Sequence, residues 1–357
     1  MNMSMDMSTF AAYYNARIRG MKSALFTGEQ MDDMLDNEDI ETMSEVLLNS
    51  PYRADMGEAL TRYRGAEAIE DAVSRNFVNT LRYLLDMAEG RFKDLGRLFF
   101  RRWDVRAAKS LLRIHGLGLG ERQVEESLTV GPTLTMPVLR DLAARESVEE
   151  LVAGLAAWDP DLCLCLAEYV AQNGSDSETA VMEEMLDRRY YAGTIQQLKN
   201  TKKYDDADIL RYILALEVDR INLRIVFETL SFKLNVDDAV NRMLNVGTLN
   251  HRILKRMVGS GSVVTATEML SGTRYSLLVE GLFTFMQTGR FSMMTHMFES
   301  IVLTEVRRLA RRLVLSIAVL MYYTYLKANE TRNLRLIARG HVSDVPHARV
   351  REGLIHV

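Results

Sequence analysis

Apolar side chains recur every three or four residues over long stretches of the chain that contain neither Pro nor Gly. Between Asp208 and Leu234, only Arg220 interrupts the apolar stripe formed by Ile209, Ile213, Leu216, Leu223, Phe227, Leu230 and Leu234. This 3.6-residue period predicts a helix with one face in the core. No Asn-Gly turn joins runs of alternating apolar and polar residues, so strands are not expected. With five prolines in 357 residues, the pattern predicts an all-α fold.

A second stretch free of Gly and Pro runs from Glu305 to Arg339. As one helix it would be about 50 Å long, with Gly340 as its C-cap. It contains the longest apolar run, Leu313 to Leu326, which is 14 residues long. Because spanning a bilayer takes about 20 residues, this run predicts a buried helix and not a membrane span. The first residues lack the basic start and apolar core of a signal peptide, which predicts a cytosolic location.

Three similar segments recur along the chain: WDVRAAKSLLR, VDRINLRIVFE and NETRNLRLIAR. Each places an acid, then three residues later a small or amide residue, then Leu or Ala, then a base. The acids are Asp104, Asp219 and Glu330, which are 115 and 111 residues apart. We predict that these acids, with Asn222 and Asn333, have structural roles in helix packing. The first copy departs from the pattern, because Ala107 and Ala108 stand where the others have Asn and Leu.

Two further patterns recur in register with these segments. Glu70, Glu183 and Glu299 lie in AIEDAV, VMEEML and MFESIV and are 113 and 116 residues apart. The turns VGPTL and VGTLN follow Asp104 and Asp219. Solenoid units repeat every 20 to 50 residues, so a period of about 113 indicates copies of a whole helical domain. The predicted domains are residues 1–145, 146–258 and 259–357.

Composition and charge narrow the functional classes. Hydrophobic residues make up 48% and charged residues 26% of the chain, which is typical of a folded globular protein. The net charge of −4 lacks the basic excess of a nucleic-acid-binding protein. Cys163 and Cys165 have no second cysteine pair with which to hold zinc, and we expect buried, reduced thiols.

The chain carries no recognisable catalytic or cofactor motif. It has no P-loop, no dinucleotide-binding fingerprint, no H-E-x-x-H pair and no nucleophile elbow. Two alternatives stay open at this point. One is an enzyme whose site assembles from Glu70, Glu183 and Glu299, although one active site rarely needs three equivalent acids. The other is a cytosolic all-helical scaffold.

Charge is unevenly distributed along the sequence. Eight acids and no base stand between Glu29 and Glu45, whereas ten bases oppose four acids from Ile301 onward. Either segment can be an ordinary solvated helix face. Either can also be a docking surface, since opposed charge steers association, and an arginine cluster can meet anionic lipid headgroups.

The segment YYNARIRGMKSALF at residues 13–26, the three acid motifs and the VGPTL and VGTLN turns together resemble one family over nearly the whole chain. The chain is similar to the C subunit of archaeal and bacterial A/V-type rotary ATPases and to the d subunit of the eukaryotic vacuolar proton pump. The resemblance implies three similar helical domains in quasi-threefold arrangement around a central funnel-like opening. It implies a non-catalytic rotor component without cofactor, metal or small-molecule substrate.

The resemblance also implies partners and a location. One copy per complex would sit on the cytoplasmic face of the membrane, as a peripheral socket and spacer between the central stalk, built from the D and F subunits, and the proteolipid ring. Torque would then link ATP turnover to ion transport. We predict partner contacts for two sets of residues: Tyr14, Asn15, Arg17, Arg19 and Lys22, and Arg307, Arg308, Arg311 and Arg312.

Overall fold

The protein is all-helical throughout the part of the chain that the structure describes, and no strand occurs there. This computed structural model describes residues 7–37, 39–117, 130–174, 177–199, 202–203, 205–279, 281–282, 292–343 and 345–356. The all-α class predicted from the apolar period is confirmed.

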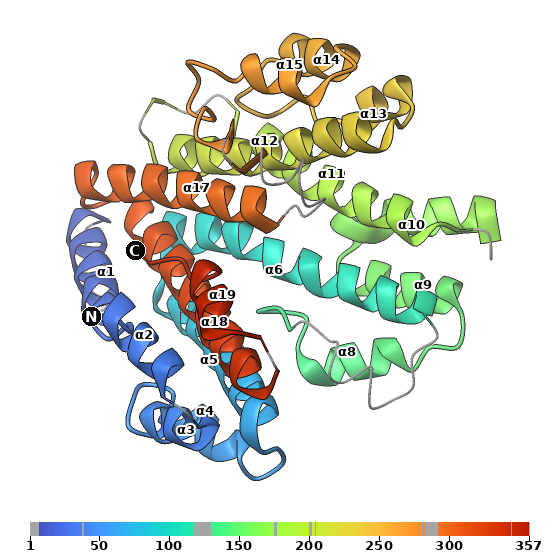
Figure 1. Ribbon diagram of the computed structural model, residues 1–357. Helices are drawn as coiled ribbons and strands as arrows, with labels where there is room; N and C mark the ends of the chain where they lie inside the picture. The colour runs from blue at the N-terminus through green and yellow to red at the C-terminus, as the bar shows by residue number, and fades with distance from the viewer. Residues whose placement is uncertain are drawn as a thin grey trace. The chain divides into compact units, whose positions relative to one another are not determined.

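The helices group into two compact units (Figure 1). Unit 1 joins residues 1–96 with residues 299–357, and unit 2 comprises residues 97–298. The helices of unit 1 are α1 (Met7–Lys22), α2 (Gly28–Asp36), α3 (Ile40–Leu48), α4 (Arg53–Ala59), α5 (Gly65–Met87), α18 (Ala318–Val342) and α19 (His347–Glu352). Those of unit 2 are α8 (Met136–Ala143), α9 (Val148–Trp158), α10 (Pro160–Asn173), α11 (Thr179–Gln197), α12 (Asp206–Phe232), α13 (Val236–Arg242), α14 (His251–Gly259) and α15 (Val263–Glu268). Helices α6 (Gly90–Leu117) and α17 (Ser292–Arg312) each contain a boundary between the units.

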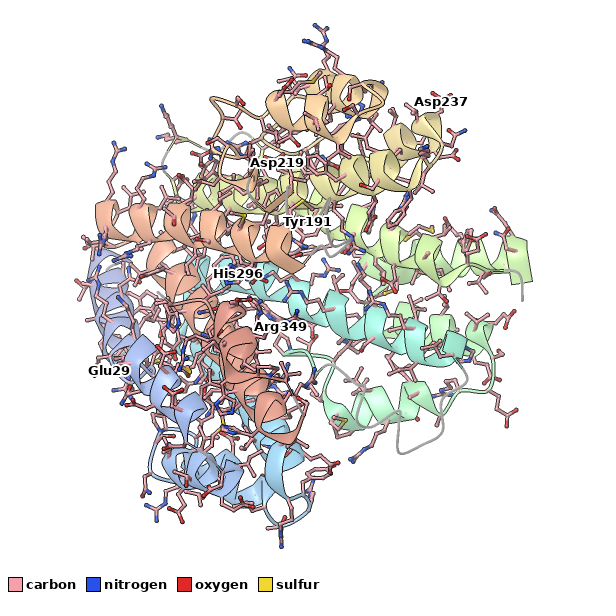
Figure 2. The ribbon with its side chains drawn as sticks, viewed as in Figure 1. Glu29, Tyr191, Asp219, Asp237, His296 and Arg349 are labelled. Atoms are coloured by element: carbon pink, nitrogen blue, oxygen red, sulfur yellow. The ribbon has the colours of Figure 1, made fainter. Side chains whose placement is uncertain are left out.

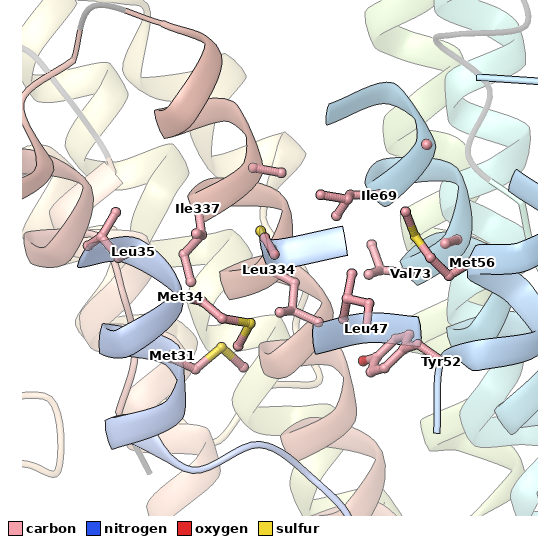
Figure 3. Packing of buried hydrophobic residues seen from close by; sticks show 14 of the residues in the cluster. Met31, Met34, Leu35, Leu47, Tyr52, Met56, Ile69, Val73, Leu334 and Ile337 are labelled. Atoms are coloured by element: carbon pink, nitrogen blue, oxygen red, sulfur yellow. The ribbon is translucent and has the colours of Figure 1, made fainter. Parts of the chain in front are cut away.

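In unit 1, α18 packs along α5, and α1, α2 and α3 also contact α18. The core between these helices is rich in methionine (Figure 3): Met31 and Met34 of α2 meet Leu334 and Ile337 of α18. Thioether side chains are unbranched and fill irregular gaps between helices. The N-terminal helices therefore share one hydrophobic core with α18 near the C-terminus.

In unit 2, α12 is the central helix, because α11, α13, α14 and α15 all pack against it. Its buried residues lie on all sides of the helix and are not confined to one stripe, which is typical of a helix inside a core. Helices α9 and α10 form a closely packed pair that is joined at Asp159. The carboxylate of Asp159 caps α10 by accepting the Leu162 N–H at 3.1 Å, and Arg101 of α6 pairs with the same carboxylate.

The helix starts follow a recurring order of capping residues. Thr27, Thr135 and Asn250 precede α2, α8 and α14, and Asp39, Ser147 and Ser262 precede α3, α9 and α15. Five of these six side chains accept a hydrogen bond from the first turn of the helix they precede; Thr135 does not. Such side chains satisfy the free N–H groups at a helix start. Three stretches of the chain, one of them near the N-terminus, therefore share one pattern of helix starts.

The predicted helix from Asp208 to Leu234 is present as α12, but its last residues differ. Lys233 has a left-handed backbone (φ 52°) and its N–H bonds to the Thr229 carbonyl, which ends the helix at Phe232. Leu234 lies beyond this turn and is exposed, and Leu230 is only partly buried. The expectation of a core position was wrong for Leu234, because the apolar period runs on past the point where the backbone turns.

The predicted single helix from Glu305 to Arg339 is wrong. Helix α17 ends at Arg312, α18 begins at Ala318, and a turn joins them. The Ser316 hydroxyl bonds to the Leu313 carbonyl at 2.7 Å and accepts the Ala318 N–H, so a side chain replaces helical backbone bonds there. Gly340 is not the C-cap either, since α18 continues to Val342 and Gly340 is buried against Val350.

Candidate functional site

The three acids of the recurring segments occupy equivalent places on three long helices. Asp104 lies on α6, Asp219 on α12 (Figure 2) and Glu330 on α18, and each is nearly inaccessible to solvent. Buried carboxylates are rare unless they are paired or hydrogen-bonded. Their partners therefore indicate what these residues do.

Asp104 holds the turn before α8. Its Oδ1 accepts the N–H groups of Thr133 and Leu134 at 2.8 and 2.9 Å. The turn approaches so closely that a Cβ built on Gly131 would overlap Asp104 Oδ1. The glycine of the VGPTL turn is thus required by contact with the acid of the preceding segment.

Asp219 holds the turn before α14 in the same way. Its Oδ1 accepts the Leu249 N–H at 2.9 Å, and its Oδ2 accepts the hydroxyls of Thr248 and Tyr275, the latter at 2.6 Å. A Cβ on Gly247 would overlap Asp219 Oδ1. The VGTLN turn and its glycine therefore repeat the arrangement found at VGPTL.

Glu330 binds the N-terminal part of the chain. Its Oε2 accepts the Phe26 N–H at 2.7 Å, and its Oε1 accepts the Tyr52 hydroxyl and the Lys327 ammonium, the latter at 2.8 Å. Phe26 stands just before the Thr27 cap of α2, as Leu134 stands before the Thr135 cap of α8. Phe26 and its neighbours are thus a third copy of the recurring turn, and it precedes the acid in sequence. We name the three arrangements around Asp104, Asp219 and Glu330 the carboxylate clamps.

Burial sets the electrostatics of the clamps. Desolvation raises the pKa of Asp104 and of Asp219, while the hydrogen bonds from their turns act in the opposite direction. Desolvation also lowers the pKa of Lys327, against the attraction of Glu330. Each clamp carboxylate is occupied by donors of the chain itself. Such buried, hydrogen-bonded groups fix backbone geometry.

The two repeated asparagines make a matching pair of bonds. Asn222 exchanges hydrogen bonds with the backbone N–H and C=O of Leu244, both at 2.8 Å. Asn333 does the same with Ile355, at 3.2 and 3.0 Å. The corresponding Ala107 and Ala108 of α6 are fully buried and offer no such side chain. Each amide therefore ties its long helix to a segment that follows it.

The repeated glutamates are dispersed into separate ion pairs. Glu70 pairs with Arg339, Glu183 with Arg113 and Glu299 with Arg332. Within the described residues no group of three or more His, Cys, Asp or Glu side chains is arranged to hold a metal ion. Both thiols are free; Cys163 is buried as expected, and burial raises its pKa to about 12, but Cys165 is only half-buried.

A small polar cavity lies in unit 2 between α6, α11 and α12. It measures about 70 Å³ and is lined by Arg102, Arg106, Lys109, Asp187 and Arg220 among others. Pockets for metabolites usually enclose about 300 Å³ or more. The buried Arg102 is engaged by Glu217 at 3.1 Å and stacks on the rings of Phe99 and Trp103. This cavity is too small for a nucleotide.

The two residue sets predicted to contact partners lie next to each other in unit 1. The first set lies on α1 and the second on the last turns of α17. Arg19 donates to the Val314 carbonyl at 2.9 Å, which joins α1 to the turn after α17. Arg17, Lys22 and all four arginines of α17 are exposed. We name the exposed bases of α1 and α17 together with Val314 and Leu315 the basic surface.

Two members of the first set point inward. Tyr14 is completely buried and donates to the Leu84 carbonyl at 2.9 Å. Asn15 is also buried and its amide donates to the carbonyls of Val314 and Ser316, both at 3.3 Å. These residues support the basic surface from beneath. The remaining members are the ones available to a partner.

The acids between Glu29 and Glu45 lie on or beside α2 and α3 in the same unit, except for Glu38, which lies outside the described residues. Arg351 of α19 pairs with Asp32 and Asp36, and Asp39 caps α3 by accepting the Thr42 N–H at 2.6 Å. Several of these acids therefore have structural partners within the chain.

Comparison with known proteins places this architecture in a family. Residues 14–353 match the family of ATP synthase (C/AC39) subunits. The chain belongs to this family. It is 26% identical over 346 residues to the C subunit of the A-type ATP synthase of Methanococcoides burtonii, which covers 96% of this chain and 94% of that protein. It is 27% identical over 357 residues to the corresponding protein of Methanothermobacter thermautotrophicus, covering 98% and 89%.

A third relative has a lower sequence identity but aligns over a similar share of both chains. The C subunit of the A-type ATP synthase of Thermoplasma acidophilum is 23% identical over 348 residues, covering 95% of this chain and 96% of that protein. The family resemblance expected from the repeated segments is thereby confirmed. Among the described helices of this family member, none is long and apolar enough to cross a bilayer.

Proposed function

We propose that the chain is a non-catalytic central-rotor component of an A/V-type ATP synthase or ATPase. The observation that carries this proposal is the family match over residues 14–353, together with relatives that are C subunits of A-type ATP synthases and align along nearly their whole length. Such a component works by transmitting torque and needs no reaction centre. The engagement of all three clamp carboxylates by the chain's own donors supports this view.

The proposed role is that of a socket and spacer. The chain would receive the central stalk, formed by the D and F subunits, and rest on the membrane proteolipid ring, so that ATP turnover and ion transport are linked through rotation. A coupling element must resist twisting, and each clamp ties a helix of more than 20 residues to a distant turn by buried hydrogen bonds. Buried bonds of this kind resist shear because breaking them leaves unsatisfied groups.

The proposed architecture consists of three helical repeats in quasi-threefold arrangement around a funnel-like opening. The three clamps and the three ordered pairs of helix caps support such repetition. The predicted boundary after residue 145 falls between α8 and α9, and the one after residue 258 falls at the last residue of α14. In this view the third clamp is completed by the N-terminal turn at Phe26, so the repeats close on one another.

The proposal places one copy per complex at the cytoplasmic face of the membrane, as a peripheral protein. No cofactor, nucleic acid or small-molecule substrate is part of the proposed role. Contacts to the partners are assigned to the basic surface, with Arg17, Arg19 and Lys22 on α1 and Arg307, Arg308, Arg311 and Arg312 on α17.

Native mass spectrometry of a tagged copy, purified from gently solubilised membranes, tests this function. We expect one copy of the chain together with a proteolipid ring and small helical stalk proteins. An untagged strain carried through the same purification gives the background. A soluble oligomer without any membrane protein would refute the rotor role and favour a cytosolic scaffold.

A second measurement assigns the partner contacts. Charge reversal of Arg17, Arg19 and Lys22 is compared with charge reversal of the four arginines of α17, and binding to purified stalk and to purified ring is measured separately. We expect each set to weaken binding to one of the two partners. Unchanged affinity for both partners would show that the basic surface is not a partner contact.

A further inference from the structure

Two exposed apolar side chains, which we name the apolar tip, lie in the turn between α17 and α18. The turn between the helices presents Val314 and Leu315, each 48% exposed. The neighbouring apolar residues Leu309 and Ile317 are buried. Two adjacent apolar side chains are therefore exposed at the turn between α17 and α18.

Three backbone carbonyls of this tip are hydrogen-bonded to side chains of the protein itself. The Val314 carbonyl accepts from Asn15 and from Arg19, and the Ser316 carbonyl accepts from Asn15. The Leu313 carbonyl accepts the Ser316 hydroxyl. A turn that enters an apolar medium must have its polar groups paired, because each unpaired group resists leaving water. These carbonyls already meet that requirement.

The two sequence segments that form and flank the tip contain bases and no acid. Residues 7–28 hold Arg17, Arg19 and Lys22 without an acid. Residues 306–329 also hold no acid, and their exposed bases are Arg307, Arg308, Arg311 and Arg312. Glu305, which pairs with Arg308 at 2.8 Å, is the acid at the edge of this region. The apolar tip therefore lies between two segments whose exposed charged side chains are bases, with Glu305 at the edge.

The form of this charge favours a diffuse anionic partner. The bases are long side chains on two helices, and within the described part of the chain Arg307 and Arg311 form no ion pair. Clusters of four to eight Lys and Arg side chains on surface helices are typical of binding to anionic lipid headgroups. The combination of basic residues and an apolar tip is typical of proteins that lie on anionic membranes.

We propose that the basic surface binds anionic lipid headgroups, and that Val314 and Leu315 enter the interfacial layer of the bilayer. This proposal rests on the proposed function, because that function brings the chain close to a membrane. Asn15 and Arg19 act as positioning residues that hold the tip in place. The acidic α2 and α3 of the same unit would be repelled by the same lipids, so the charge asymmetry also orients the protein.

Vesicle co-sedimentation of the purified full chain tests the proposal without any other protein. The probes are vesicles of phosphatidylcholine alone and of an equal mixture with phosphatidylglycerol. We expect binding only to the mixture and weaker binding at high salt, because exposed charges are screened. The double variant Arg311→Glu with Arg312→Glu should weaken binding by at least about tenfold, since each base near the surface contributes roughly 1 kcal/mol.

Matched variants separate charge from apolar insertion. Arg53→Glu with Arg349→Glu changes two exposed bases of unit 1 outside the basic surface (Figure 2 labels Arg349) and should leave binding unchanged. Val314→Ser with Leu315→Ser should weaken binding several-fold, whereas Val342→Ser, at another exposed valine, should not. All of these side chains are exposed, so folding is retained and is checked by circular dichroism.

Failure of the lipid proposal is distinguishable from failure of the proposed function. If the wild-type chain does not bind anionic vesicles yet purifies with a proteolipid ring, the lipid proposal is overturned and the rotor role stands. If the Arg311 and Arg312 variant loses the ring while vesicle binding is unaffected, the basic surface serves a protein partner. Equal weakening by the control variants would likewise overturn the lipid assignment.

Discussion

Removal of the Asp219 carboxylate should destabilise unit 2 more than removal of any exposed acid. Asp219→Ala leaves the Leu249 N–H and the buried Tyr275 hydroxyl without their acceptor. An unsatisfied buried donor costs about 1–3 kcal/mol. Relief of the desolvated charge offsets part of this sum, so the expected loss in unfolding free energy is about 2–4 kcal/mol.

The assay is urea unfolding followed by circular dichroism, with hydrogen exchange as a local readout. The amide of Leu249 should exchange faster in Asp219→Ala, because its acceptor is gone. Asp219→Asn keeps the Oδ1 acceptor and should lose less stability. Asp237→Ala, at an exposed position in α13 (Figure 2), is the matched control and should change stability by less than about 1 kcal/mol.

One result would refute the reasoning about the clamps. If Asp219→Ala is no more destabilising than Asp237→Ala, the carboxylate does not hold the turn. Unchanged exchange of the Leu249 amide in a destabilised variant would show that stability is lost somewhere else. Either outcome would also weaken the argument that the clamps stiffen the proposed rotor.

Three further predictions concern the same clamps. Gly131→Ala and Gly247→Ala should each lower the unfolding free energy by about 1–3 kcal/mol, because the new Cβ overlaps the clamp carboxylate. Gly193→Ala, whose Cβ would meet no atom, should instead stabilise α11 by about 0.5–1 kcal/mol. Equal effects of the three variants in melting experiments would contradict the close approach. Lys327→Met should lower the unfolding free energy by about 3–5 kcal/mol, because it leaves Glu330 without its buried cation. Arg339→Ala, at the exposed pair with Glu70, should lower it by less than about 1 kcal/mol. Urea unfolding of the two variants measures both values. The pKa of Asp219 is raised above its ordinary 3.8 in the folded chain. The part of its contribution to stability that depends on proton binding is therefore greatest below pH 3.8 and is lost as the pH rises through the folded pKa. The stability of wild type relative to Asp219→Asn should increase as the pH falls, and the opposite slope would exclude the raised pKa.

The sequence predicts the helical class and the location of the clamps because both depend on short-range pattern. The 3.6-residue period identifies α12, and regular recurrence of an acid singles out Asp104, Asp219 and Glu330. The partners of these acids are much harder to predict. Leu134 and Leu249 lie 30 residues after their acids, whereas Phe26 lies 304 residues before Glu330. Only the fold brings them together.

The missed features have identifiable physical causes. The third turn lacks the glycine that marks the other two, because the longer side chain of Glu330 reaches Phe26 without such a close approach of the backbone. The break between α17 and α18 contains neither Gly nor Pro and depends on Ser316 and on bonds from Asn15 and Arg19. A capping signal at Thr27, with Gln30 completing its capping box, is the trace of the third turn that the sequence does contain.

The clamp between Glu330 and Phe26 has a consequence for how the chain is made. A ribosome releases residues 1–96 first, but their core is completed only by α18, which emerges near the end of synthesis. Residues 97–298 meet their own partners earlier. We therefore expect the middle of the nascent chain to fold before its beginning. Met31, Met34 and their neighbours should stay exposed to solvent until α18 has been translated.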